Sequence, residues 1–283
     1  MVTSTLNISP DHVARHYNEL DRFYRKLWGD HVHHGYWETG RESPQKATER
    51  LIDLIVEPLH LSDQQRVADV GCGYGGSARY LTRNHGVRVT GFTLSQEQAA
   101  YAETQGRDLP HPPEILVRNW LENQIPDATY DAIYSIECLA HVTDKPRYFA
   151  ELKRTLKPGG HASFTAWLSG NAPTQWQTRH LLEPICDEGR LPSMGTDADY
   201  RSMIADAGLE LLSFRDLTRQ VEKTWSICCR RLATFILTDP EAWRYLLSKE
   251  RSEAVFIPSL WRILHAYRRG AMRYGWFVVQ SPS

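Results

Sequence analysis

A cluster of glycines at residues 71–76 constrains the fold of this chain more than any other feature. The residues before it (RVADV, 66–70) have the pattern of a buried strand, and those after it (SARYLTRNHG, 77–86) have the pattern of a helix. Glycine at the end of a strand permits a tight turn and lets the backbone approach a ligand, while the next helix offers free N–H groups. The cluster therefore predicts a strand, a ligand-binding turn and a helix.

The same alternation of strands and helices continues as far as residue 168. The predicted strands are VRVTGF (87–92), EILV (114–117), YDAIYSI (130–136) and HASFTAWL (161–168), and the predicted helices are SQEQAAYAE (95–103) and KPRYFAELKRTLKPGG (145–160). Strands that alternate with helices form a parallel sheet with right-handed crossovers. The expected fold class is therefore α/β, with a Rossmann-like, doubly wound and mostly parallel sheet.

The segments outside this alternation add helices and late strands. Residues 11–28 repeat apolar positions at helical spacing, and Pro44 begins a second helix. Strands at 209–214 and 272–280 flank an aromatic-rich helical insertion, and the last one is expected as an antiparallel C-terminal edge strand. The predicted parts are an N-terminal helical cap (1–60), a ligand-binding core (61–168), a covering segment (169–196), the continued core (197–217), a helical substrate cap (218–270) and the final edge strand (271–283).

Composition and charge exclude several classes of protein. Of the 283 residues, 33 are Lys or Arg and 34 are Asp or Glu, so a net charge of −1 argues against a nucleic-acid partner. No apolar run is long enough to span a membrane. The five cysteines are odd in number and scattered, which indicates a reduced, cytoplasmic protein. No metal-site spacing occurs, so we predict no metal, and a homodimer is expected because such assemblies are the commonest.

The glycine cluster alone does not identify the ligand. Gly71, Gly73 and Gly76 satisfy the GxGxxG spacing of NAD sites. However, Asp69 lies at the strand end, where NAD sites are usually apolar, and no acidic residue follows the second strand to bind a ribose. An NAD(P) oxidoreductase therefore stays only as an alternative, which thermal stabilisation by NAD(P) would support.

Three motifs together resemble those of class I S-adenosylmethionine (SAM) methyltransferases: DVGCGYGG (69–76), GFTLSQEQ (91–98) and IYSIECLAHVTDKPRYFAELKRTLKPGG (133–160). The flanking segments LWGDHVHHGYW (27–37) and HAYRRGAMRYG (265–275) resemble the small-molecule group that includes tocopherol methyltransferases, plant alkaloid N-methyltransferases and bacterial natural-product methyltransferases. The resemblance implies a SAM-dependent methyltransferase that releases S-adenosylhomocysteine (SAH).

The resemblance also implies which residues bind SAM. The methionine moiety would lie on the backbone of Gly71, Gly73 and Gly75, with Asp69 near its ammonium. The other implied contacts are Thr93, Leu94 and Gln98 for the ribose, Asn119 and Trp120 for the adenine, Tyr17 as a cover over SAM, and Glu137 facing the transferred methyl. A second interpretation of Gln98 is local, since Ser95-x-x-Gln98 forms a capping box at a helix start.

Catalysis of methyl transfer requires an aligned nucleophile and, for a phenol, hydroxyl or ammonium, a base that takes a proton. His141 is the leading candidate because it follows the fourth strand and histidine titrates near neutral pH. A histidine that only hydrogen-bonds the backbone is the alternative. Glu137 and His34 are the further catalytic candidates, and His33 is a candidate lining residue.

Aromatic residues indicate the kind of acceptor. Nine Trp and thirteen Tyr are many for this length, and several lie outside the predicted sheet: Tyr17, Tyr24, Trp28, Tyr36, Trp37, Trp176, Trp225, Trp243 and Trp261. A roof of aromatic residues favours a partly apolar aromatic or alkaloid-like natural product, methylated on N, O or C. C-methylation of an isoprenoid chain, and a SAM-binding protein that transfers no methyl group, remain alternatives.

Overall fold

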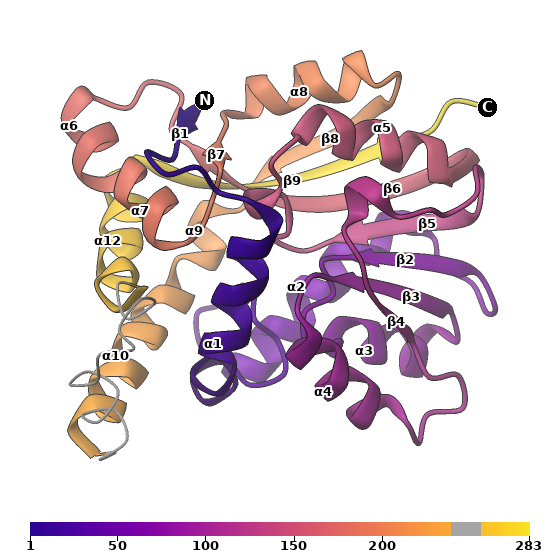
Figure 1. Cartoon of the computed structure of the whole chain (residues 1–283), viewed down its shortest axis with the longest axis horizontal. Helices are drawn as coiled ribbons and strands as arrows, with labels where there is room; N and C mark the ends of the chain where they lie inside the picture. The colour runs from indigo at the N-terminus through magenta and orange to yellow at the C-terminus, as the bar shows by residue number, and fades with distance from the viewer. Residues whose placement is uncertain (239–255) are drawn as a thin grey trace.

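The central element is a mixed sheet of seven strands in the order β4-β3-β2-β5-β6-β9-β8 (Figure 1). The structure is a computed structural model and describes residues 1–238 and 256–283. The strands are β2 (Arg66–Val70), β3 (Arg88–Thr93), β4 (Glu114–Val117), β5 (Tyr130–Ser135), β6 (Leu156–Ser169), β8 (Glu210–Asp216) and β9 (Met272–Gln280). Strands β2 to β6 pair in parallel, which confirms the predicted α/β, Rossmann-like fold.

The C-terminal strand β9 is antiparallel, as predicted, but it does not lie at the edge of the sheet. It pairs with β6 on one side and with β8 on the other, so β8 is the edge strand. Strand β9 is buried along nearly its whole length, whereas β8 is mostly exposed. The predicted edge position was therefore wrong, and continuous burial of β9 is the signal of an inner strand.

Helices cover both faces of the sheet because successive residues of a strand point to opposite faces. Val67 of β2 belongs to a core cluster with helices of one face, and Ala68 to a cluster with helices of the other. The first face carries α2 (Pro44–Val56), η1 (Glu57–Leu59) and α3 (Gly76–His85), and the second carries η2 (Trp120–Glu122), α5 (Lys145–Thr155) and α8 (Asp197–Asp206). Helix α4 (Gln96–Gly106) packs beside β4 and α1 (Pro10–Trp28).

Local sequence signals set most helix ends. The Ser43 hydroxyl caps the start of α2, and Gly86, with φ +65°, ends α3. Helix α5 ends at Thr155, earlier than predicted, because β6 already begins at Leu156. Pro158 explains the difference, since proline cannot continue a helix and pushes the residue before it toward an extended conformation.

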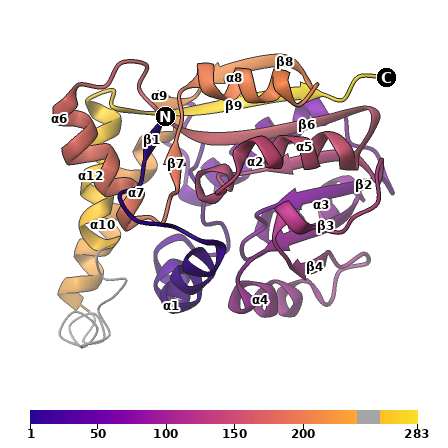
Figure 2. The same cartoon turned by 45° about the horizontal axis from the view of Figure 1, so that its top comes forward.

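A cap of helices lies over the carboxyl ends of the strands (Figures 1 and 2). Helix α1 contacts α4 and α10 (Lys223–Thr238), and α10 packs on α12 (Phe256–Arg268). The smaller elements of the cap region are β1 (Val2–Thr3), η3 (Leu139–His141), α6 (Gln175–Gln177), η4 (Thr178–Leu182), α7 (Glu183–Glu188), β7 (Ser193–Met194) and α9 (Thr218–Val221). Residues 239–255 of the predicted helical insertion, including Trp243, lie outside the described residues.

Two findings concern the described residues as a whole. None of their helices is both long and apolar enough to cross a membrane. All five cysteines are described, and each is a free thiol.

Candidate active site

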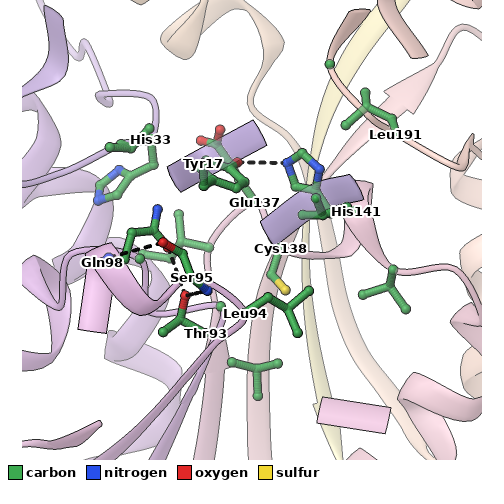
Figure 3. Close-up of a pocket in the computed structure, with 18 of the residues that line it drawn as sticks. Tyr17, His33, Thr93, Leu94, Ser95, Gln98, Glu137, Cys138, His141 and Leu191 are labelled. Carbon is green, nitrogen blue, oxygen red and sulfur yellow. Dashed lines mark hydrogen bonds between the residues drawn. The ribbon is translucent and has the colours of Figure 1, made fainter. Parts of the chain in front are cut away.

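A cavity of about 170 Å³ lies where the cap meets the carboxyl ends of β2, β3, β4 and β5. The motif residues Gly73, Thr93 and Glu137 line it from the sheet, and Tyr17 and Trp225 line it from the cap. Figure 3 shows Thr93, Glu137 and Tyr17 around this space. Ligands of open α/β sheets bind beyond the carboxyl ends of the strands. The cavity therefore occupies the position that the fold favours for a binding site.

The glycine turn contributes two lining residues, Gly71 and Gly73, both with positive φ. A Cβ atom on Gly71 would collide with Cys138, whereas one on Gly73 would meet only Gln98 Nε2, at 3.9 Å. Gly73 therefore leaves open space where a ligand can approach the backbone. Gly75 does not line the cavity; it caps α3, and a Cβ there would press on Ala102 of α4.

Asp69, predicted near the ammonium of SAM, does not line the cavity and is only 2% exposed. Its Oδ2 accepts a hydrogen bond of 2.6 Å from the Tyr134 hydroxyl. Burial raises the pKa of Asp69 to about 7, against the opposing effect of this hydrogen bond. The carboxyl therefore joins the end of β2 to β5.

The end of β3 and the segment after it carry Thr93, Leu94 and Gln98, which all line the cavity (Figure 3). The Ser95 hydroxyl accepts from the Gln98 backbone N–H and caps α4, which is the first half of the predicted capping box. The second half is missing, because Gln98 Oε1 accepts from the Thr93 hydroxyl at 2.8 Å instead. The Gln98 side chain therefore faces the site, and its Nε2 keeps two donors for a ligand.

Asn119 and Trp120 follow β4 and line the same cavity, together with Arg118. The Asn119 side-chain oxygen accepts from the Leu121 N–H and caps η2, which leaves its amide NH₂ as a donor. Trp120 is 4% exposed, and its indole contacts Phe92 edge-on at 5.1 Å. These residues form the end of the cavity that lies near β4.

Tyr17 and His141 meet inside the cavity. The Tyr17 hydroxyl lies 2.9 Å from His141 Nε2 (Figure 3). His141 Nδ1 lies 3.3 Å from the carbonyl oxygen of Arg190. A carbonyl oxygen only accepts, so Nδ1 carries the proton and Nε2 accepts from Tyr17. Burial, with a smaller effect of His16, lowers the pKa of His141 to about 4, so the ring is neutral at pH 7.

Glu137 and His34 form a second buried group on the cavity wall. Glu137 Oε1 accepts from the backbone N–H and Nδ1 of His34 and from the Tyr274 hydroxyl, while Oε2 accepts from Trp167 Nε1 at 3.0 Å. Trp225 Nε1 donates to His34 Nε2 at 2.6 Å. Both ring nitrogens of His34 therefore have protein partners, and Glu137 Oε2 is the carboxylate oxygen with the most remaining acceptor capacity.

The predicted aromatic roof is present in part. Tyr17, Tyr24, Trp28 and Trp225 line the cavity. Tyr36 and Trp37 are buried outside it, and Trp176 and Trp261 are 55% and 57% exposed. These last two were wrongly expected at the roof, because their helical spacing does not show which face of the cap turns to solvent.

Several lining residues were missed in the sequence. Trp167 lies in a strand that was predicted, but its neighbours Glu137 and Trp225 come from distant segments, so no local signal marked it. Leu191, Ile185 and Thr224 had no motif signal at all. Among the described residues, no three His, Cys, Asp or Glu side chains gather as a metal site would require.

The family model described as mycolic acid cyclopropane synthetase matches residues 6–237. The chain belongs to the mycolic acid cyclopropane synthetase family. This family assignment agrees with the resemblance to SAM methyltransferases drawn from the motifs.

The following similar proteins match nearly the whole length of the chain. Tocopherol O-methyltransferase, chloroplastic, from Arabidopsis thaliana is 28% identical over 95% of this chain and 82% of its own length. The solved structure of the (4+2)-cyclase SpnF is 25% identical, with a TM-score of 0.83 and 99% of both chains covered. Mycolic acid cyclopropane synthase CmaA1, solved with SAH and CTAB, shares the fold at 20% identity, with a TM-score of 0.85 and coverage of 97% and 99%.

The chain is a SAM-dependent methyltransferase of small molecules. Its cavity fits SAM, because Gly73 leaves room for a ligand against the backbone, and because Gln98 and Asn119, which line the same space, carry unused amide donors.

Proposed function

We propose that the protein methylates a small, partly apolar aromatic or alkaloid-like natural product, on nitrogen, oxygen or carbon, with His141 as the base. The observation that carries this proposal is the hydrogen bond between Tyr17 and His141 Nε2 in the cavity of the glycine turn. A base that shares one cavity with the cofactor motifs can reach the acceptor.

The proposed binding of SAM uses residues from three strand ends and the cap. Gly71 and Gly73 would present backbone groups to the methionine part, and Thr93, Leu94 and Gln98 would contact the ribose. Asn119 and Trp120 would hold the adenine, and Tyr17 would cover the cofactor. We propose that Gly75 and Asp69 act from outside the cavity by holding the turn in place. Bound SAM supplies a methyl group activated by a sulfonium.

The proposed proton path runs from the acceptor through Tyr17 to His141. Burial raises the pKa of Tyr17, so its hydroxyl stays protonated and donates to Nε2. As the acceptor loses its proton to the Tyr17 oxygen, the Tyr17 proton passes to His141 Nε2. The imidazolium formed would be held by the Arg190 carbonyl at Nδ1.

His34 has a different proposed role. Because Nδ1 and Nε2 already bond Glu137 and Trp225, His34 does not offer a free nitrogen to the acceptor. We therefore propose that His34 is a positioning residue that orients Glu137, and that Glu137 contacts the acceptor or the methyl group directly.

The division of the chain into a core and caps is also proposed to be functional. Each of the three segments outside the core supplies a roof residue. Tyr17 comes from residues 1–60, Leu191 from the covering segment 169–196, and Trp225 from residues 218–270. Such a roof would exclude water during transfer. C-methylation of an isoprenoid chain is the second candidate, favoured by the apolar roof.

The test is to incubate the purified protein with SAM and fractions of small aromatic and alkaloid metabolites and to measure SAH. We expect acceptor-dependent SAH formation that His141→Ala reduces strongly while SAM affinity is retained. Absence of SAM binding, or equal SAH formation by His141→Ala and the unmodified protein, would contradict the proposal.

A further inference from the structure

Glu137 carries a nearly buried carboxylate, and no cationic side chain of the described residues forms an ion pair with it. Its side chain is 10% exposed, and the ion pairs found among the described residues give it one partner, His34, at 2.7 Å. The remaining contacts are the neutral donors Tyr274 and Trp167. Whether the negative charge of Glu137 is neutralised thus depends on the protonation of His34.

Trp225 decides the protonation of His34. An indole N–H can only donate, so His34 Nε2, at 2.6 Å from Trp225 Nε1, must accept and carries no proton. Nδ1 then holds the ring's single proton and donates it to Glu137. His33 beside it donates Nδ1–H to the His34 carbonyl, and burial lowers its pKa, so it adds no positive charge either. Glu137 therefore keeps an uncompensated negative charge.

Three indole rings surround the same part of the cavity. Trp28, Trp167 and Trp225 all line it, and the Trp225 ring meets Trp167 edge-on at 5.6 Å and Trp28 at 6.3 Å. Aromatic faces attract cations, most strongly where water is excluded. A buried negative charge beside such rings favours a bound cation over a neutral group of the same shape.

We propose that this subsite takes an amine acceptor, bound as a cation between the three tryptophans and opposite Glu137. The inference rests on the proposed function and names its substrate class. Trp225 acts as a specificity-determining residue, because its hydrogen bond keeps His34 neutral. The negative charge of Glu137 is then neutralised by a cationic ligand and not by His34.

The charge of Glu137 favours a nitrogen acceptor over an oxygen acceptor. The bound ammonium first gives its proton to the Tyr17–His141 pair. The nitrogen lone pair then forms the N–C bond, the sulfur keeps the electrons of the broken S–C bond, and the positive charge passes to nitrogen, where Glu137 stabilises it. A phenol develops negative charge on oxygen before attack, which Glu137 would repel.

The test compares choline with its neutral carbon isostere, 3,3-dimethylbutan-1-ol, by calorimetry on the SAH-loaded protein. We expect choline to bind roughly tenfold more tightly. Glu137→Gln should remove this preference for choline. Trp225→Phe should reduce the preference, because His34 Nε2 is then free to take a proton. The matched controls Glu103→Gln and Trp261→Phe change exposed residues and should leave the preference intact.

Equal affinity for the two probes, or a preference that survives Glu137→Gln, would overturn the inference. A second measurement uses tyramine, which carries an amine and a phenol in one molecule, with mass spectrometry to locate the methyl group. Methylation of nitrogen supports the inference, and methylation of the phenol oxygen overturns it while leaving the proposed function standing. A protein that binds no SAH would overturn the proposed function and this inference together.

Discussion

The hydroxyl of Tyr17 lies 2.9 Å from Nε2 of His141, although the two residues are 124 positions apart in the chain. Tyr17 comes from the N-terminal helix α1, and His141 ends the short helix η3 after β5. The bond joins the cap to the sheet across the cavity. It therefore links closure of the cap to the orientation of the proposed base.

Replacing His141 by alanine should lower kcat by about two orders of magnitude, the range typical of a lost general base. SAH affinity, measured by calorimetry, should change little because Nε2 faces Tyr17. His180→Ala, at an exposed position, is the control. If the acceptor is a carbon–carbon double bond, the variant should alter product ratios more than rate. Unchanged rate, pH profile and products would remove His141 from the site.

Replacing Tyr17 by phenylalanine distinguishes its proposed role in proton transfer from its proposed role as a cover over the cofactor. The ring still covers the cavity, but the hydroxyl that donates to His141 is lost. We expect kcat to fall by about tenfold or more, with nearly unchanged SAH affinity. An unchanged kcat in Tyr17→Phe, together with weaker SAH binding in Tyr17→Ala, would show that Tyr17 acts only as a cover.

The acidic limb of the pH–rate profile should lie near pH 4. Burial lowers the pKa of His141 from 6.5 to about 4, so the neutral form persists in the folded protein well below pH 6.5. The unfolded chain binds this proton first, so the contribution of His141 to folding stability is present above pH 6.5 and is lost as pH falls toward 4. An acidic limb near pH 6.5 would contradict the buried, neutral state of His141. Chemical denaturation at pH values from 4 to 7 measures the change in the free energy of unfolding.

Gly73→Val should abolish measurable SAH binding. Gly73 has φ +52°, and its Cβ position opens into the cavity, so valine combines backbone strain with a side chain in the ligand space. Gly208→Val is the matched control, because Gly208 has φ +71°, open space and no place in the cavity. Equal SAH affinity in the Gly73 variant and the unmodified protein would contradict the assignment of the glycine turn to the cofactor site.

Deletion of residues 1–30 should leave a folded sheet without turnover. The buried residues Leu20 and Tyr24 of α1 form a small cluster with Tyr74, separate from the two clusters that pack the sheet. Circular dichroism and a cooperative thermal transition would report the sheet, and SAH formation would report turnover. A truncated protein with the kcat of the full chain would show that the cap is dispensable.

The sequence alone determined the parallel part of the sheet, β2 to β6, and the place of the cofactor motifs. Alternating apolar strands and helices, with glycines at the end of β2, depend on interactions between residues near one another in the chain. For the same reason the helix start at Ser43 and Pro44 was readable, since a cap bonds to the N–H groups of its own first turn. The cavity residues Gly73, Thr93 and Asn119 followed from the resemblance of their motifs to those of SAM methyltransferases.

Tertiary structure alone decided the contacts that give the site its chemistry. The inner position of β9, the contact between Tyr17 and His141, and the solvent-facing side of Trp261 depend on packing between distant segments. The charge left on Glu137 depends on Trp225, which belongs to α10 and acts on Glu137 through its hydrogen bond to His34. Local patterns carry no information on such contacts, because hydrogen bonding and burial are settled when the cap closes over the sheet.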